Sequence, residues 1–169
     1  MKSLIILCII LSSCAYANEH RILISGFTKH EHSYRSNGEH YNEVNLGGGY
    51  EFTTFTDYNE FYFGTNLTVI DDSYENLQYT VSVSSNIRFK LSKNMALSIG
   101  IAGFSTWKKN NFKAGVSEDE GEYSLMIGAA PLSSFYYKDF SVNFAYVPSA
   151  SYEQKENVGF LIVYFGWRL

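Results

Sequence analysis

Apolar and polar residues alternate along several long stretches of this chain. From position 77 to position 91, apolar side chains occupy the odd positions, with one serine among them, and polar side chains occupy the even positions. The same period of two runs through residues 61–69, 95–102, 140–147 and 161–169. Such alternation is typical of β-strands with one apolar face, and the first run is longer than most strands of globular proteins. The pattern therefore predicts a protein built of long β-strands.

Eight strands are expected, at residues of roughly 21–33, 43–55, 59–71, 75–91, 95–107, 121–136, 139–148 and 157–169. Their connections alternate between tight turns, which include 56–58, 92–94 and 138–139, and longer loops, which include 34–41, 71–74, 108–121 and 149–156. Apolar residues outside, small or polar residues inside and short periplasmic turns are the signature of a transmembrane barrel. A soluble barrel of the lipocalin type would turn the apolar face inward, but the aromatic strand ends and a secretion signal favour the membrane. The predicted fold is all-β, an eight-stranded antiparallel up-and-down transmembrane β-barrel.

The N-terminus has the layout of a secretory signal peptide. A lysine precedes the apolar run at 4–11, and Ala-Tyr-Ala at 15–17 forms a small-x-small cleavage site. The run is too short to span a bilayer as a helix, which needs ~20 apolar residues. Leu-Ser-Ser-Cys at 11–14 also resembles a lipoprotein cleavage site, and both readings stay open. The expected domains are a signal peptide at 1–17, or at 1–13 with a lipidated Cys14, and one barrel domain at 18–169 in the bacterial outer membrane.

Composition narrows the chemistry further. The chain has 14 Tyr and 13 Phe, which suits a barrel with aromatic strand ends, and its net charge of −4 gives no support for nucleic-acid binding. Cys8 would leave with the signal peptide, so at most one cysteine remains and no disulfide is expected. The histidines lack convincing ligand spacing with other donors, so we expect no metal site and no cofactor.

The up-and-down order brings three chemically useful residues to one rim. The first strand ends near His30, and the third ends at Asp72 and Ser73, both at the outer end of the barrel. A histidine can take a proton from a hydroxyl while a carboxylate orients or stabilises the imidazolium. A histidine, a hydroxyl and a carboxylate close together are therefore groups suited to acyl transfer. His32 shares a strand face with His30 and is the alternative histidine.

Short motifs in a specific order resemble the lipid A palmitoyltransferase (PagP-like) family over about residues 22–169. They are Thr28-Lys29-His30, Tyr41-Asn42-Glu43 with Gly47-Gly48-Gly49, Asp72-Ser73-Tyr74, Pro131-Leu132-Ser133-Ser134 and Tyr146-Val147-Pro148. The resemblance implies a monomeric outer-membrane acyltransferase with a phospholipid as acyl donor and lipid A or a related surface glycolipid as acceptor. It assigns His30 as general base, Asp72 as its polar partner and Ser73 as a polarised hydroxyl or a nucleophile.

The same resemblance suggests how the substrate is bound. Proline cannot donate to a strand ladder, so Pro131 and Pro148 should leave a gap between the sixth and seventh strands. In the family, lipid enters the barrel from the outer leaflet through such a gap in the wall. Ser84 aligns with a family glycine at the floor of the acyl pocket, and the larger serine predicts an acyl chain shorter than palmitate.

The inward positions divide the predicted interior in two. Charged residues gather near the periplasmic end, where they could form a plug, namely Glu51, Arg88 and Arg168. Apolar and small residues occupy the upper part, which suits an acyl chain: Ile70, Gly100, Ala102, Phe104 and Ala145.

The chain also departs from the family. An amphipathic helix before the first strand is missing, and Asn45 stands where the family has a proline of a second door. Two other functions therefore remain open, a lipid A deacylase-type hydrolase on a similar barrel and a non-catalytic barrel for adhesion or surface masking.

Overall fold

The computed structural model describes residues 18–32, 40–56, 60–110, 122–148, 150–152, 155–157 and 159–169. The expected signal peptide and the alternative lipidated Cys14 lie outside the described residues, so both stay predictions.

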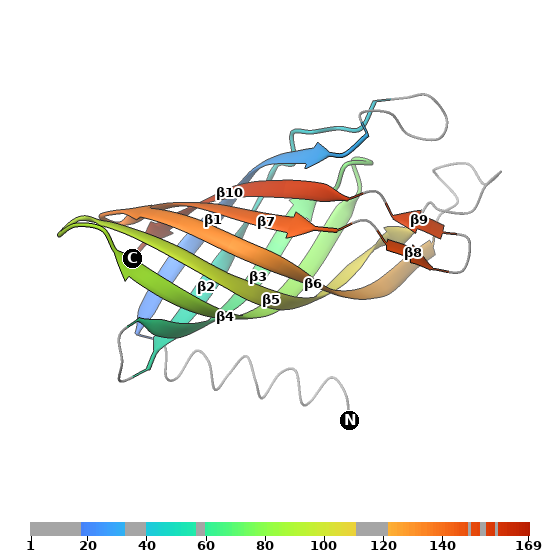
Figure 1. Cartoon of the computed structure of the whole chain (residues 1–169). Helices are drawn as coiled ribbons and strands as arrows, with labels where there is room; N and C mark the ends of the chain where they lie inside the picture. Colours follow the sequence, from blue (N-terminus) through green and yellow to red (C-terminus); the bar gives the residue numbers. More distant parts are fainter. Residues whose placement is uncertain are drawn as a thin grey trace.

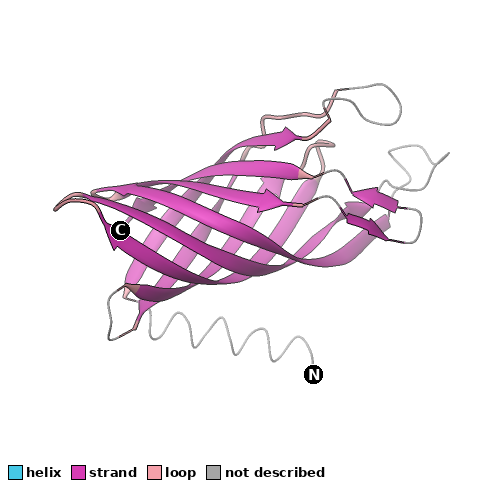
Figure 2. Ribbon diagram, in the orientation of Figure 1, coloured by secondary structure: helices cyan, strands magenta, loops and turns pink. Residues whose placement is uncertain are grey.

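Long antiparallel strands make up most of the described chain (Figures 1 and 2). They are β1 (Glu19–His30), β2 (Gly47–Phe55), β3 (Phe61–Asp71), β4 (Leu77–Lys90), β5 (Met95–Asn110), β6 (Glu122–Tyr137), β7 (Phe140–Val147), β8 (Ala150–Tyr152), β9 (Lys155–Asn157) and β10 (Phe160–Arg168). Each of the eight predicted strands has its counterpart here. The small β8–β9 hairpin was not expected, because it lies in a segment predicted as a loop.

Eight of these strands close into one barrel in the order β1-β10-β7-β6-β5-β4-β3-β2. Every pairing is antiparallel, and β1 closes the barrel by pairing with both β2 and β10. The tight turn at Lys138–Asp139 joins β6 to β7 at the same end as the C-terminus, while the β8–β9 hairpin extends from the opposite end (Figure 1). The predicted eight-stranded antiparallel barrel is therefore confirmed. In the described part of the chain, no helix is long and apolar enough to cross a membrane.

The two faces of the strands have opposite chemistry. Large apolar side chains point outward and are exposed, among them Val83, Phe89, Ile99 and Ile101. Small polar side chains point inward and are buried, among them Thr53, Ser84, Asn86, Ser98 and Asn143. A soluble lipocalin-type barrel would have the reverse arrangement, so the outer surface is suited to lipid.

Aromatic side chains mark both ends of this apolar band. Trp107 and Tyr123 stack with ring centroids 6.3 Å apart near the outer end, and Trp167 is exposed near the periplasmic end. Aromatic girdles at both interfaces are characteristic of outer-membrane barrels.

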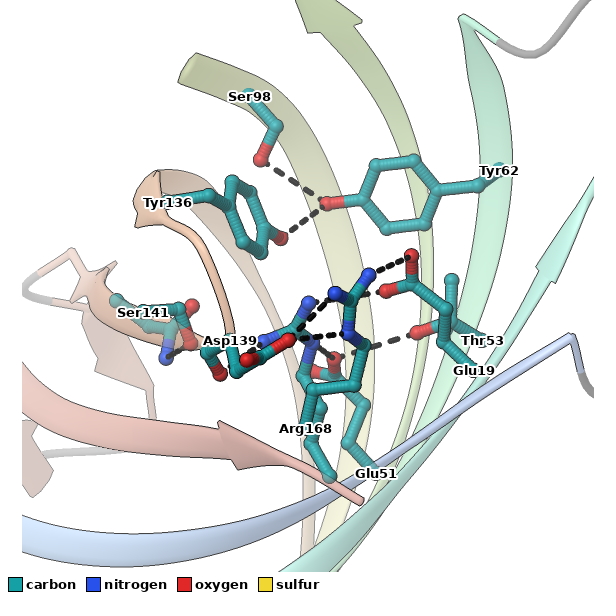
Figure 3. Close-up of polar contacts among 12 residues, drawn as sticks. Glu19, Glu51, Thr53, Tyr62, Ser98, Tyr136, Asp139, Ser141 and Arg168 are labelled. Carbon is teal, nitrogen blue, oxygen red and sulfur yellow. Dashed lines mark hydrogen bonds and ion pairs between the residues drawn. The ribbon is translucent and has the colours of Figure 1, made fainter. Parts of the chain in front are cut away.

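A charged cluster fills the periplasmic end of the interior (Figure 3). Arg21, which is 2% exposed, reaches Glu19 at 2.9 Å and Glu51 at 3.7 Å. Arg88 lies 3.4 Å from Glu19, and its guanidinium stands 4.3 Å from the ring centroid of Tyr136. The side chains of Glu51 and Arg88 thus point into the barrel, as predicted.

Two further contacts complete this plug. The Tyr62 hydroxyl bonds to Ser98 Oγ at 3.0 Å and to the Tyr136 hydroxyl at 2.8 Å, which joins β3, β5 and β6 across the interior. Arg168 sits at the lower edge, where its Nε donates to Asp139 at 2.9 Å and its side chain is 43% exposed. We call these residues together the charged plug: Glu19, Arg21, Glu51, Tyr62, Arg88, Ser98, Tyr136, Asp139 and Arg168.

Arg21→Met should lower the free energy of unfolding by about 3–5 kcal/mol, because it leaves the buried carboxylate of Glu51 without this cationic partner. Arg168→Met removes a more exposed pair and should cost about 1 kcal/mol or less. Urea denaturation in phospholipid vesicles measures both values. Equal losses in the two variants would contradict the assignment of Arg21 to the interior of the plug.

Candidate active site

The ladder between β6 and β7 stops halfway up the barrel. It runs from Tyr137↔Phe140 to Leu132↔Ala145, whereas β6 pairs with β5 along its whole length. Among the described residues, positions 122–131 of β6 therefore have no ladder partner on the β7 side, and β6 runs on beyond the end of β7 (Figure 1). The last pair lies directly next to Pro131, which lacks the N–H that would continue the ladder. We call this break the lateral gap.

An apolar cavity of about 320 Å³ occupies the upper interior beside this gap. Inward-facing side chains of most strands line it, for example Leu23, Ile70, Ala102, Ala130 and Ile162. Ile127 and Ala129 also border the cavity, although both are exposed on the outer side of β6. The cavity thus reaches the unpaired edge of β6 at the lateral gap.

A β-bulge in β1 turns His30 toward the inside. Below the bulge the odd positions face inward, as the burial of Leu23 and Ser25 shows. Ser25 pairs with Tyr164 and Phe27 with Val163, so Gly26 is an extra residue in the strand. One extra residue reverses the facing of all later positions, and Thr28 and His30 are buried in consequence. His32, the alternative histidine, lies beyond the end of β1 and is exposed.

A tight turn after β3 presents Asp72 and Ser73. Oδ1 of Asp72 accepts hydrogen bonds from the backbone N–H groups of Tyr74 at 2.9 Å and Asn76 at 3.0 Å. The turn includes Glu75 with φ of 63°, and the Asn42 N–H donates to the Ser73 carbonyl at 3.1 Å. The Asp72 carboxylate therefore holds the loop that presents Ser73.

The three predicted residues line one small pocket of about 50 Å³ at the rim. His30, Asp72 and Ser73 share it with Lys108 and Tyr41. The His30 imidazole stacks on the Tyr41 ring with centroids 4.0 Å apart and planes 11° apart, which fixes its orientation. We call this space the rim pocket.

The rim pocket and the apolar cavity adjoin each other. Five residues line both, which are Ile70, Gln78, Lys108, Phe160 and Ile162. A chain lying in the cavity would therefore bring its end group to His30 and Ser73.

Two buried oxygens of the rim pocket have no donor among the described residues. They are Oδ2 of Asp72 and Oδ1 of Asn45. Asn45 is 1% exposed, and its Nδ2 donates to the Asp71 carbonyl at 2.9 Å. These oxygens can accept hydrogen bonds from a bound hydroxyl.

Lys108 also lines the site, although the sequence pattern predicts a loop there. β5 continues to Asn110, and its even positions face inward. Extending the same alternation by three residues would have placed Lys108 in the interior, where its charge acts on that of Asp72. Tyr41 had been noticed only as part of a motif, and its stacking on His30 has no signal in the sequence.

The other predicted binding residues lie in different places. Pro148 lines the cavity, whereas Pro131 is exposed on the outer surface and affects the site through its backbone alone. Ser84 is buried beneath the cavity rather than in its wall, where it accepts a hydrogen bond from Asn86 Nδ2 at 2.8 Å. Ser82 lines the cavity instead. Among the described residues, no group of three or more His, Cys, Asp or Glu side chains could hold a metal ion.

The fold and its polarity define an outer-membrane β-barrel with an apolar internal cavity beside a break in its strand pairing. Residues 11–166 match the model of the family described as "Antimicrobial peptide resistance and lipid A acylation protein PagP", and the chain belongs to this family. No curated protein sequence matches the chain.

Similar solved structures include three of the Yersinia pestis outer membrane protein Ail, the attachment invasion locus protein. In a phospholipid bilayer nanodisc it has 11% identity and a TM-score of 0.44, covering 89% of this chain and 99% of Ail. The crystal structure of Ail has 12% identity and a TM-score of 0.45, covering 89% of this chain and 97% of Ail. The complex with the heparin analogue sucrose octasulfate has 12% identity and a TM-score of 0.43, with the same coverage.

Family membership places the chain in the bacterial outer membrane, among lipid A acylation proteins that use membrane lipids as substrates. The predicted family and localisation are thereby confirmed.

Deleting Gly26 should turn His30 away from the rim pocket. The lower half of β1 should keep its facing, because Arg21 belongs to the charged plug, so the upper half should reverse. Cysteine labelling with a water-soluble thiol reagent, in a Cys14→Ser background, tests this. With Gly26 present, Lys29→Cys should react faster than His30→Cys, and with Gly26 deleted the order should invert. An unchanged order would contradict the role given to the bulge.

Proposed function

We propose that this protein is an outer-membrane acyltransferase that moves a fatty acyl chain from a phospholipid to lipid A or a related surface glycolipid. The single observation that carries the proposal is the junction of the two spaces. A pocket lined by His30, Asp72 and Ser73 opens onto an apolar cavity that reaches the membrane through the lateral gap. A water-soluble substrate would need neither the apolar cavity nor the gap.

In the proposed reaction, the acyl chain of the donor lies in the cavity and its ester carbonyl lies in the rim pocket. His30 takes the proton from a hydroxyl of the acceptor, and that oxygen attacks the ester carbon. The bond from this carbon to the glycerol oxygen breaks, and the proton on His30 passes to the departing lysophospholipid. Ser73 either polarises the carbonyl through its hydroxyl or forms a transient acyl-enzyme.

Three other side chains support this chemistry. Lys108 lines both spaces, so its ammonium group can stabilise the negative charge that develops on the ester oxygen. The buried oxygens of Asn45 and Asp72 can accept hydrogen bonds from the acceptor lipid, whose headgroup sugars are rich in hydroxyls. Asp72 also keeps Ser73 in position through its turn.

The acyl chain is proposed to be shorter than palmitate. Ser84 packs directly under the cavity, and its Oγ lies 2.7 Å from the place where a Cβ of Gly64 would stand. A glycine at position 84 would leave this space open and allow the floor to move down. The serine therefore limits the depth that a chain can reach.

His30→Ala and Ser73→Ala should each reduce acyl transfer by about a hundredfold or more, the usual contribution of such groups. Mass spectrometry of lipid A from cells that express each variant measures the transfer. His32→Ala is the matched control and should retain activity, because His32 is exposed outside the pocket. Full activity of both site variants would refute the assignment.

The same measurement separates the possible functions. An added acyl chain supports transfer, and loss of a chain supports hydrolysis. If lipid A and other glycolipids stay unchanged, the barrel has a non-catalytic role such as adhesion.

Ser84→Gly should shift the transferred chains toward greater length, because it opens space under the cavity. Ser85→Gly is the control, since its side chain points to the opposite face of β4. The chain-length distribution of the product, measured with a mixture of saturated phospholipids, reports the effect. Efficient transfer of palmitate by the unaltered protein would disprove the proposed chain length.

A further inference from the structure

One aromatic ring stands on the inner face of β5, where the other inward residues are small except Lys108 at the upper end. The inward positions below it are Ala96, Ser98, Gly100 and Ala102, and Thr106 follows above. Phe104 thus projects the one large apolar side chain of this described strand into the cavity, which it lines. It is positioned to affect any chain bound there.

The ring lies over a glycine of the neighbouring strand. Phe104 is paired with Gly128 of β6. A Cβ on Gly128 would lie 2.5 Å from Cζ, 3.0 Å from Cε2 and 3.1 Å from Cε1 of the ring. Since real Cβ atoms do not approach so closely, the ring occupies the room that the missing side chain leaves. Any larger residue at position 128 would push the ring into the cavity.

This contact lies beside the lateral gap. Gly128 belongs to the part of β6 that pairs only with β5, and its neighbours Ile127 and Ala129 border the cavity from the outer side. An acyl chain that enters through the lateral gap comes in past this unpaired stretch of β6, beside Gly128. It therefore passes the ring of Phe104.

We propose that Phe104, seated over Gly128, determines acyl specificity at the lateral gap by setting the width of the passage. A saturated chain can straighten and slide past a flat ring, whereas a cis double bond fixes a kink that needs more width. The pair therefore selects straight saturated chains over kinked chains of equal length. This inference rests on the proposed function and concerns chain shape, which is separate from the length limit assigned to Ser84.

The test uses two phospholipids whose transferred chains have the same number of carbons, one saturated and one with a central cis double bond. The purified full-length protein receives both together, and mass spectrometry gives the ratio of the two products. Phe104→Ala should lower the preference for the saturated chain about tenfold, within the range for a change in an apolar pocket. Phe104→Leu gives a milder shift in the same direction and replaces Phe104→Ala if that variant does not fold.

Gly128→Ala provides the opposite change. Its Cβ should force the ring inward, slow transfer of both chains and strengthen the preference for the saturated one. Combining it with Phe104→Ala should restore the rate, because the new Cβ then meets no ring. Ile99→Ala is the control and should leave the ratio unchanged, because Ile99 is exposed on the outer face of β5 and does not line the cavity.

The outcomes separate the two levels of the proposal. An unchanged product ratio in an active Phe104→Ala variant overturns the specificity role and leaves the acyltransferase function intact. Absence of rescue in the double variant also overturns it. Absence of transfer in the unaltered protein refutes the proposed function itself.

Discussion

Lipid cannot form hydrogen bonds with a polypeptide backbone, so a sheet that spans a membrane must close on itself. The barrel obeys this constraint through pairing of β1 with both β2 and β10. It departs from it above Leu132↔Ala145, where β6 loses its second neighbour. Pro131 ends the ladder there without adding an N–H that needs a partner. Pro131 thus spares the edge of the opening one unpaired N–H group, and the cavity lies directly beside this opening.

The interior separates two tasks by height. Near the periplasm, paired charges and tyrosine hydroxyls join strands from all sides of the barrel. Above them, small and apolar residues leave an open space, and the rim again becomes polar around His30 and Ser73. The contacts at the periplasmic end hold β3, β5 and β6 together independently of the lateral gap. The barrel can therefore keep an unpaired strand edge at its outer end.

Much of this arrangement follows from a period of two in the sequence. That period predicted the eight strands, the lipid-facing surface and the inward positions of Glu51 and Arg88, since each depends on local alternation. It did not predict which way the residues after the bulge in β1 face, nor that the residues at the end of β5 continue the strand. The bulge at Gly26 reverses the facing of β1, so strict counting from Leu23 would have turned His30 toward the lipid. The predicted strand ends at residue 107, whereas β5 continues to Asn110, so the inward position of Lys108 was not predicted. The stacking of Tyr41 on His30 depends on a contact between two separate segments, which a single sequence does not encode locally.

The charged plug also has a consequence for the cell that carries this protein. The outer membrane acts as a sieve that keeps harmful solutes out, and an eight-stranded barrel with an open interior could weaken it. Here a molecule that entered from outside would reach Arg21, which pairs with Glu19 and lies over the Tyr136 ring on the other side of the bore. Passage would require these contacts to break together. The protein can thus expose an internal workspace to the outer leaflet while the envelope stays sealed.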